Sequence, residues 1–260
     1  MKYKTTLFIL SLALRSQAIA APTIIVGQGV NPGDWIARSV VALVATNSRS
    51  QALCTASIVA EDLAITAGHC ISDLGSSIGK DAVKPNFTLF FGAEIRHLDA
   101  AHIREVDAVE IPKDWKPSSH KKQNTSDVAL VHFSGGLPDG YQAADLMPFD
   151  RILTKGEDIE LAGYGISNAT ADTGAGVLRK VLVNMKDPDF SSTEVELDQS
   201  HGGGACHGDS GGPAFLMIKG YPYLFGITSR GSGACDETVI YTRISAFSEW
   251  FAEASANLRK

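Results

Sequence analysis

Short apolar runs rich in β-branched residues, separated by clusters of Gly, Pro, Asn and Asp, recur along most of this chain. Such runs are typical of strands joined by turns, whereas helices need longer stretches with a period near 3.6 residues. The runs span Val40 to Ala45, Ala56 to Ala60, Phe87 to Phe91, Val128 to Phe133, Ile159 to Ala162, Val177 to Val183, Ala214 to Ile218 and Leu224 to Ile227. The sequence therefore predicts an all-β protein.

One amphipathic helix is expected at the C-terminus. Its apolar residues recur at steps of three and four, which places them on one face of a helix: Ile244, Phe247, Trp250, Phe251 and Ala254.

Glycines and prolines gather between Phe133 and Phe149, which indicates a connection between two β units. We place the N-terminal unit at 25–140 and the C-terminal unit, with the terminal helix, at 141–260. The Gly- and Ser-rich region from Ser72 to Asn86 is predicted to be a surface loop.

Residues 1–20 have the features of a signal peptide. Lys2 and Lys4 form its charged start, Leu7 to Leu14 its apolar stretch, and Ala18 to Ala20 a small-residue cleavage site. A membrane anchor is the alternative, but the apolar run is shorter than the roughly 20 residues that span a bilayer. We therefore expect a secreted or periplasmic protein that has no contact with the membrane after cleavage.

The four cysteines are expected to form disulfides, because an exported chain folds in an oxidising environment. Sequence alone leaves three connectivities open. Zinc binding is the other interpretation, and it is disfavoured because the chain has no CxxC or HxxxH spacing.

The formal net charge is −6, which provides no broad basic surface for a phosphate backbone. Nucleic acid is therefore not an expected partner.

The segment from Gly208 to Pro213 carries the features of a nucleophile site. Ser210 is flanked by glycines, which let the backbone turn so that the N–H groups of Gly208 and Ser210 point at one oxyanion. The segment also fits the G-x-S-x-G elbow of α/β-hydrolases. In that fold the catalytic histidine follows the serine, yet the last histidine of this chain is His207, so the base must lie upstream.

Two upstream segments offer the base and its partner. His69 follows the apolar run Leu63 to Ile65, which predicts that it lies at a strand end beside Cys70. Asp127 directly precedes another apolar run, where a carboxylate can be buried against an imidazole, fix its tautomer and stabilise the imidazolium.

With TAGHC around His69, DVAL at Asp127 and GDSGGP around Ser210, the chain resembles the trypsin/chymotrypsin (S1) family of serine proteases, in the family's residue order. The resemblance covers essentially the whole mature chain. It implies two six-stranded antiparallel β-barrels and a secreted serine endopeptidase that forms an acyl-enzyme without metal or cofactor.

The resemblance also implies roles for residues outside the three motifs. Cys54 pairs with Cys70, and Cys206 pairs with Cys235. Ser229 matches the family serine that donates a hydrogen bond to the catalytic aspartate.

In this family a freed N-terminal amine pairs with the aspartate before the nucleophile and organises the oxyanion hole. Ile25 and Asp209 match these two partners, so a zymogen with residues 21–24 as a short propeptide is expected. No Arg or Lys precedes Ile25, which disfavours tryptic activation, and we hypothesise that two dipeptides are trimmed instead.

The resemblance places five residues around the substrate: Gly204, Ser229, Arg230, Gly231 and Val239. Gly204 stands at the position that forms the floor of the primary specificity pocket, and a glycine provides no carboxylate there. Cleavage after Arg or Lys is therefore disfavoured. Val239 shortens the pocket, which predicts a small or medium apolar residue before the cut. A large aromatic residue is the competing prediction. The guanidinium of Arg230 either favours acidic groups of the substrate or folds out to solvent.

The expected partners are protein or peptide substrates and protein inhibitors, and we expect a monomer. A catalytically inactive binding module with the same fold is the rival interpretation, and an esterase is a weaker one.

Overall fold

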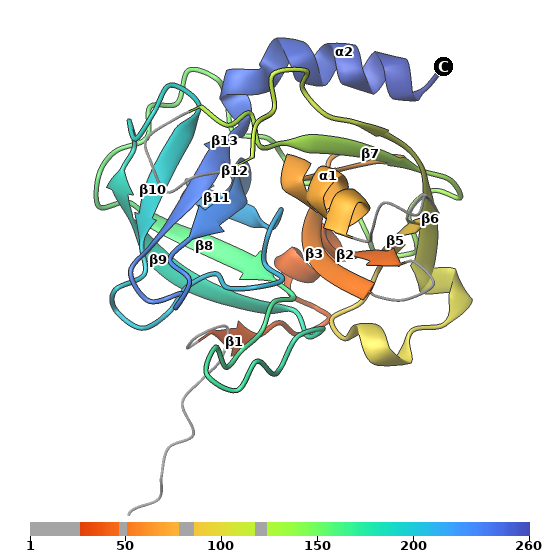
Figure 1. Cartoon of the computed structure of the whole chain (residues 1–260), viewed down its shortest axis with the longest axis horizontal. Coiled ribbons are helices and arrows are strands. Elements are labelled where there is room, and N and C mark those ends of the chain that lie inside the picture. The colour runs from red at the N-terminus through yellow and green to blue at the C-terminus, as the bar shows by residue number, and fades with distance from the viewer. Residues whose placement is uncertain (1–26, 47–50, 78–85, 118–123) are drawn as a thin grey trace, which may run out of the picture.

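The computed structural model describes residues 27–46, 51–77, 86–117 and 124–260. Within these ranges the chain forms two β-barrels that lie side by side, and a terminal helix runs along one side of the pair (Figure 1). The prediction of two six-stranded antiparallel barrels with a C-terminal helix is confirmed.

The first barrel closes through the strand order β2-β3-β4-β7-β6-β5, and every neighbouring pair is antiparallel. Its strands are β2 (Val40–Thr46), β3 (Gln51–Ile58), β4 (Leu63–Thr66), β5 (Asn86–Phe90), β6 (Ile103–Glu110) and β7 (Ala129–Phe133).

Burial in the first barrel follows the sequence pattern of each strand. In β2 every residue from Val40 to Ala45 is buried, because one face of the strand lines the barrel core and the strand also contacts the second barrel. In β6 exposed and half-buried residues alternate for most of its length, as they do in a strand with one face in solvent.

The second barrel contains β8 (Asp158–Gly163), β9 (Arg179–Asp187), β10 (Glu194–Asp198), β11 (Pro213–Ile218), β12 (Tyr221–Gly231) and β13 (Thr238–Arg243). They follow the order β9-β10-β13-β12-β11-β8, and the pairing of β8 with β9 closes the barrel. A two-residue strand, β1 (Gln28–Gly29), pairs with β9 from outside.

Two α-helices accompany the barrels. Helix α1 (Gly68–Ser77) follows β4 directly, so the helix occupies the first part of the region from Ser72 for which a loop was predicted. Helix α2 (Ser248–Leu258), preceded by a 3₁₀ turn at Ile244–Phe247, packs on β6 and β7 of the first barrel. No helix in the described ranges has the length and apolar character needed to cross a membrane.

The barrels are joined by buried polar contacts as well as apolar ones. The hydroxyl of Tyr164, which follows β8, donates to the carbonyl oxygens of Val40 at 3.1 Å and Gly92 at 2.8 Å. The amide of Thr55 in β3 donates to the carbonyl oxygen of Ser210 at 2.8 Å. These contacts fix the first barrel against the segments of the second barrel that carry the candidate site.

The connection between the barrels contacts each in turn. Ala144 donates its amide to Ile58 of the first barrel, and Met147 donates its amide to Leu224 of the second. The chain therefore passes from one barrel to the other within this short stretch.

Candidate active site

His69 and Asp127 form a hydrogen-bonded pair on the first barrel. His69 lies in the first turn of α1, three residues past the end of β4, and Asp127 lies two residues before β7. The sequence predicted His69 at the strand end itself. His69 Nδ1 lies 2.9 Å from Asp127 Oδ2, and the His69 amide donates to Asp127 Oδ1 at 2.9 Å. The aspartate is buried, while the histidine side chain is 21% exposed.

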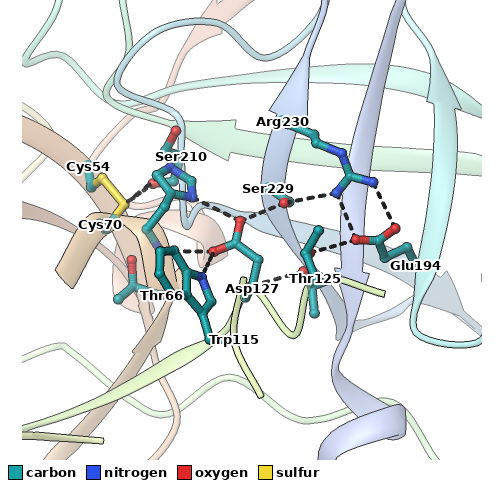
Figure 2. Close-up of polar contacts among 12 residues, drawn as sticks. Cys54, Thr66, Cys70, Trp115, Thr125, Asp127, Glu194, Ser210, Ser229 and Arg230 are labelled. Carbon is teal, nitrogen blue, oxygen red and sulfur yellow. Dashed lines mark hydrogen bonds and ion pairs between the residues drawn. A yellow bond between two sulfur atoms is a disulfide. The ribbon is translucent and has the colours of Figure 1, made fainter. Parts of the chain in front are cut away.

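Two further donors reach the Asp127 carboxylate. Ser229 donates its hydroxyl to Oδ2 at 2.6 Å, and Trp115 donates its indole N–H to Oδ1 at 3.3 Å (Figure 2). Burial acts to raise the pKa of Asp127, but the charge of His69 and the hydrogen bonds from His69 and Ser229 outweigh it and hold that pKa below its usual value. The carboxylate is therefore held ionised.

The role of Trp115 was not predicted from the sequence. Its indole lies against Gly68, where an added Cβ would be 2.6 Å from the ring, so the ring covers the backbone that carries His69. The glycine before the histidine is the one signal in the sequence for this close approach.

Ser210 belongs to the second barrel and is brought to the pair by the barrel interface. Its carbonyl oxygen lies 3.6 Å from Cys70 Sγ, and that sulfur lies 3.9 Å from His69 Nε2. Gly211, at φ +80°, lies so close to the first barrel that an added Cβ would be 2.0 Å from Thr66 Oγ1. Only glycine fits there, and its absence of a side chain lets Ser210 approach the first barrel.

Gly208 turns the backbone before Ser210 with φ +97°, and an added Cβ there would lie 2.9 Å from the α-carbon of Gly165. Its carbonyl oxygen accepts from Thr55 Oγ1 at 3.0 Å, which fixes the peptide. Within the described part of the chain, the amides of Gly208 and Ser210 donate to no protein acceptor.

A cavity of about 140 Å³ opens beside Ser210 in the second barrel. Its lining includes four of the five residues expected around a substrate: Ser229, Arg230, Gly231 and Val239. Among the described residues, no carboxylate side chain lines it.

Gly204, expected at the floor of the primary pocket, is not among the residues that line this cavity, whereas its neighbour Ala205 is. The buried side chain of Gln199 lies against both residues. Its Oε1 accepts from the Ala205 amide at 2.8 Å, and an added Cβ on Gly204 would lie 2.1 Å from that oxygen. Gln199 therefore holds the backbone of Ala205, which lines the cavity, and the sequence did not indicate this contact.

Arg230 adopts neither of the two conformations expected for it. Its guanidinium is buried in a two-pronged ion pair with Glu194 of β10, with Nη1 2.7 Å from Oε1 and Nη2 2.8 Å from Oε2 (Figure 2). The side chains of Arg230 and Glu194 are 6% and 0% exposed. The guanidinium therefore faces neither the solvent nor an acidic group of a substrate.

Asp209, the residue before Ser210, is buried with both carboxylate oxygens bound to backbone. Gly165 donates to Oδ1 and Cys206 donates to Oδ2, each at 2.8 Å. Burial raises the pKa of Asp209 to about 6, although these two amides and the charges of Arg179 and His207 act in the opposite direction. Ile25, its expected partner, lies outside the described residues.

The disulfides join Cys54 to Cys70 and Cys206 to Cys235, which are the pairs that the resemblance implied. The only groups of potential metal ligands in the described ranges contain these same sulfur atoms, beside His69 and His207. A sulfur in a disulfide lacks the thiolate that zinc requires.

Comparison with known proteins places this geometry in a family. The chain is 27% identical over 236 residues to the urokinase-type plasminogen activator of Gallus gallus, an alignment that covers 83% of this chain and 53% of that protein. The chain thus spans about half the length of this curated relative. A solved structure described as HL collagenase has the same fold, with a TM-score of 0.71 at 20% identity, and the match covers 88% of this chain and 97% of that one.

The family model for trypsin matches residues 24–251, which include both barrels and all the site residues described above. The chain therefore belongs to the trypsin family of serine proteases.

Proposed function

We propose that the chain is a secreted serine endopeptidase with Ser210 as nucleophile, His69 as general base and Asp127 as the residue that orients the histidine. The observation that carries the proposal is the 2.9 Å hydrogen bond between His69 Nδ1 and Asp127 Oδ2. Because Nδ1 is engaged with Asp127, Nε2 is the ring atom proposed to accept the proton. Nε2 lies 3.9 Å from Cys70 Sγ, and that sulfur lies 3.6 Å from the carbonyl oxygen of Ser210.

In the first step, the Ser210 hydroxyl oxygen forms a bond to the carbonyl carbon of the substrate while His69 Nε2 takes the hydroxyl proton. The carbonyl electron pair moves onto its oxygen, which the amides of Gly208 and Ser210 stabilise. Asp127 keeps its negative charge beside the imidazolium and does not take the proton.

The imidazolium then gives its proton to the leaving amine as the carbon–nitrogen bond breaks, and an acyl-enzyme on Ser210 remains. Water repeats the sequence: His69 takes a proton from it, the oxygen attacks the ester, and Ser210 recovers its hydrogen. No metal or cofactor takes part.

We expect a small or medium apolar residue before the scissile bond. The cavity beside Ser210 is small and Val239 lines it. Within the described ranges, no carboxylate side chain lines it to pair with a substrate Arg or Lys. Burying an unpaired cation there would be strongly unfavourable.

Activation is proposed to depend on Asp209. Its carboxylate is buried and raised in pKa, so it is a favourable partner for a cation such as the amine of Ile25. Removal of residues 21–24 would free that amine, and the uncut chain would be a zymogen.

Export is supported by the signal-peptide features of residues 1–20 and by the two disulfides. We accordingly expect a secreted or periplasmic monomer that acts on protein or peptide substrates and is open to protein inhibitors.

A fluorophosphonate probe tests the catalytic proposal against a binding module with the same fold, since the probe modifies only an activated serine. The secreted chain should be labelled on Ser210, as located by peptide mass spectrometry, and Ser210→Ala should not be labelled. If the mature protein and the Ser210→Ala control behave alike, the chain is a binding module.

A further inference from the structure

Glu194 and Arg230 form a buried ion pair that is linked to the proposed catalytic residues through hydrogen bonds. Arg230 Nη1, besides contacting Glu194, lies 3.3 Å from the Ser229 hydroxyl oxygen, which lies 2.6 Å from Asp127 Oδ2 (Figure 2). The contacts thus run from Glu194 through Arg230 and Ser229 to Asp127.

The direction of the Ser229 hydrogen bond follows from the chemistry of its neighbours. A guanidinium has only donors, so Ser229 Oγ accepts from Arg230. The single hydroxyl hydrogen of Ser229 is then directed to Asp127 Oδ2, which is an acceptor. Arg230 therefore fixes the orientation of Ser229 and places positive charge beside the hydroxyl that binds Asp127.

Glu194 also reaches Asp127 by a second route. Thr125, two residues before Asp127, donates its hydroxyl to Glu194 Oε1 at 2.7 Å, and the contact is buried. One carboxylate from β10 therefore holds both the backbone that carries Asp127 and, through Arg230, the serine that binds it.

The energetics favour a positioning role over a purely stabilising one. Removing two charges from water costs about as much as their attraction returns, so a buried pair adds little to stability compared with packed apolar side chains. The two-pronged geometry, by contrast, fixes the orientation of both groups.

We propose that Glu194 and Arg230 are positioning residues for catalysis, which orient the Ser229–Asp127–His69 chain from within the second barrel. This inference rests on the proposed endopeptidase function. It adds that the rate of the chemical step depends on an ion pair that does not contact the reacting atoms.

A mutant cycle on kcat with a peptide amide substrate tests the proposal. In the Arg230→Met, Glu194→Gln double variant both charges are removed, so no unpaired charge remains buried. We expect kcat to fall about tenfold, equal to about 1.4 kcal/mol. The glutamine that replaces Glu194 keeps an oxygen that can accept from Thr125, so the two substitutions remove only the route through Ser229. In the Ser229→Ala background they should therefore lower kcat less than about twofold.

The proposal is overturned if kcat is unchanged in the double variant or falls by the same factor in both backgrounds. Arg151→Met with Glu157→Gln is the control, because it removes a partly exposed ion pair in the segment before β8. Its kcat should equal that of the wild type. If the test variant does not fold, the Arg230→Lys variant decides. A single ammonium cannot donate to both oxygens of Glu194 and to Ser229 as the planar guanidinium does, so kcat should fall severalfold. A kcat equal to that of the wild type would overturn the proposal.

The low-field proton resonance of the His69–Asp127 hydrogen bond gives a second readout. It should shift in the double variant and stay unchanged in the control, and an unshifted resonance would contradict a positioning role. The wild-type chain is assayed first. If it does not hydrolyse the amide, the proposed function has failed; if it does and the variants match it, only the ion-pair proposal has failed.

Discussion

The indole N–H of Trp115 lies 3.3 Å from Asp127 Oδ1, so an aromatic side chain in the segment between β6 and β7 donates to the carboxylate that holds His69. This contact adds a fourth donor to those from the His69 backbone, the His69 ring and Ser229.

Trp115→Phe tests the contribution of this donor, since phenylalanine keeps the ring over Gly68 but cannot donate. We expect kcat/KM to fall about fivefold, because a long hydrogen bond to a charged group contributes about 1 kcal/mol. The urea midpoint should change little. An unchanged kcat/KM would show that the indole only covers the backbone.

The buried charge of Asp209 predicts a pH dependence of stability for the uncut chain. Its pKa of about 6 in the folded state lies above the ordinary value of 3.8, so the folded state binds the proton more tightly than the unfolded state does. The contribution of Asp209 to the free energy of unfolding is therefore fully present below about pH 4 and is lost as the pH rises through about 6.

Urea unfolding from pH 4 to 8 measures this effect, in a Ser210→Ala background that prevents self-digestion. The free energy of unfolding of the chain, minus that of its Asp209→Asn variant, should fall by roughly 2 to 3 kcal/mol between pH 4 and 6.5 and then stay level. Other titrating groups cancel in this difference. A difference that does not change with pH, or that rises, would contradict the assignment.

The cavity beside Ser210 predicts substrate preference. Among amide substrates that differ at the cut site, Ala or Val should react faster than Phe, and Arg should be slowest. Val239→Ala should raise the Phe-to-Ala ratio of kcat/KM about tenfold, since one or two methyl groups in an apolar pocket decide discrimination of that size.

Val195→Ala is the matched control for this experiment, because Val195 is equally buried in the second barrel but does not line the cavity. Its substrate ratios should equal those of the wild type. Fastest turnover of the Arg substrate would overturn the pocket argument.

Much of this architecture could be predicted from the sequence, because the signals were local. The run from Val40 to Ala45 is apolar at every position and forms a fully buried strand. His69, Asp127 and Ser210 each lie in a short motif, and the Cys54–Cys70 bridge lies directly beside His69.

Other elements could not be predicted, because their signals were weak or depended on distant residues. Strand β6 has charged residues at every third position or closer, which hid the alternation of apolar and polar residues that marks a strand. Helix α1 continues into a Gly- and Ser-rich stretch that has low helix propensity. Glu194 and Arg230 are 36 residues apart and meet only through the barrel. The contact between Gln199 and the Ala205 amide likewise joins residues that share no sequence motif.

The proposed activation predicts the N-terminus of the active protein. Sequencing of the mature enzyme should begin at Ile25, because that amine is the partner proposed for Asp209. An active enzyme that begins at Ala21 would refute the trimming of two dipeptides, and a start at Ile24 would shift the proposed pair by one residue.

The central claim is that Ser210, His69 and Asp127 act as one unit, and a comparison of kcat/KM for Ser210→Ala, His69→Ala and the variant with both substitutions tests it most directly. When two residues act in the same chemical step, removing one of them already abolishes the contribution of the other. The kcat/KM of the double variant should therefore lie within about tenfold of that of each single variant. Losses that multiply, so that the double variant falls by the product of the two single effects, would show that the two side chains act independently and would contradict the account.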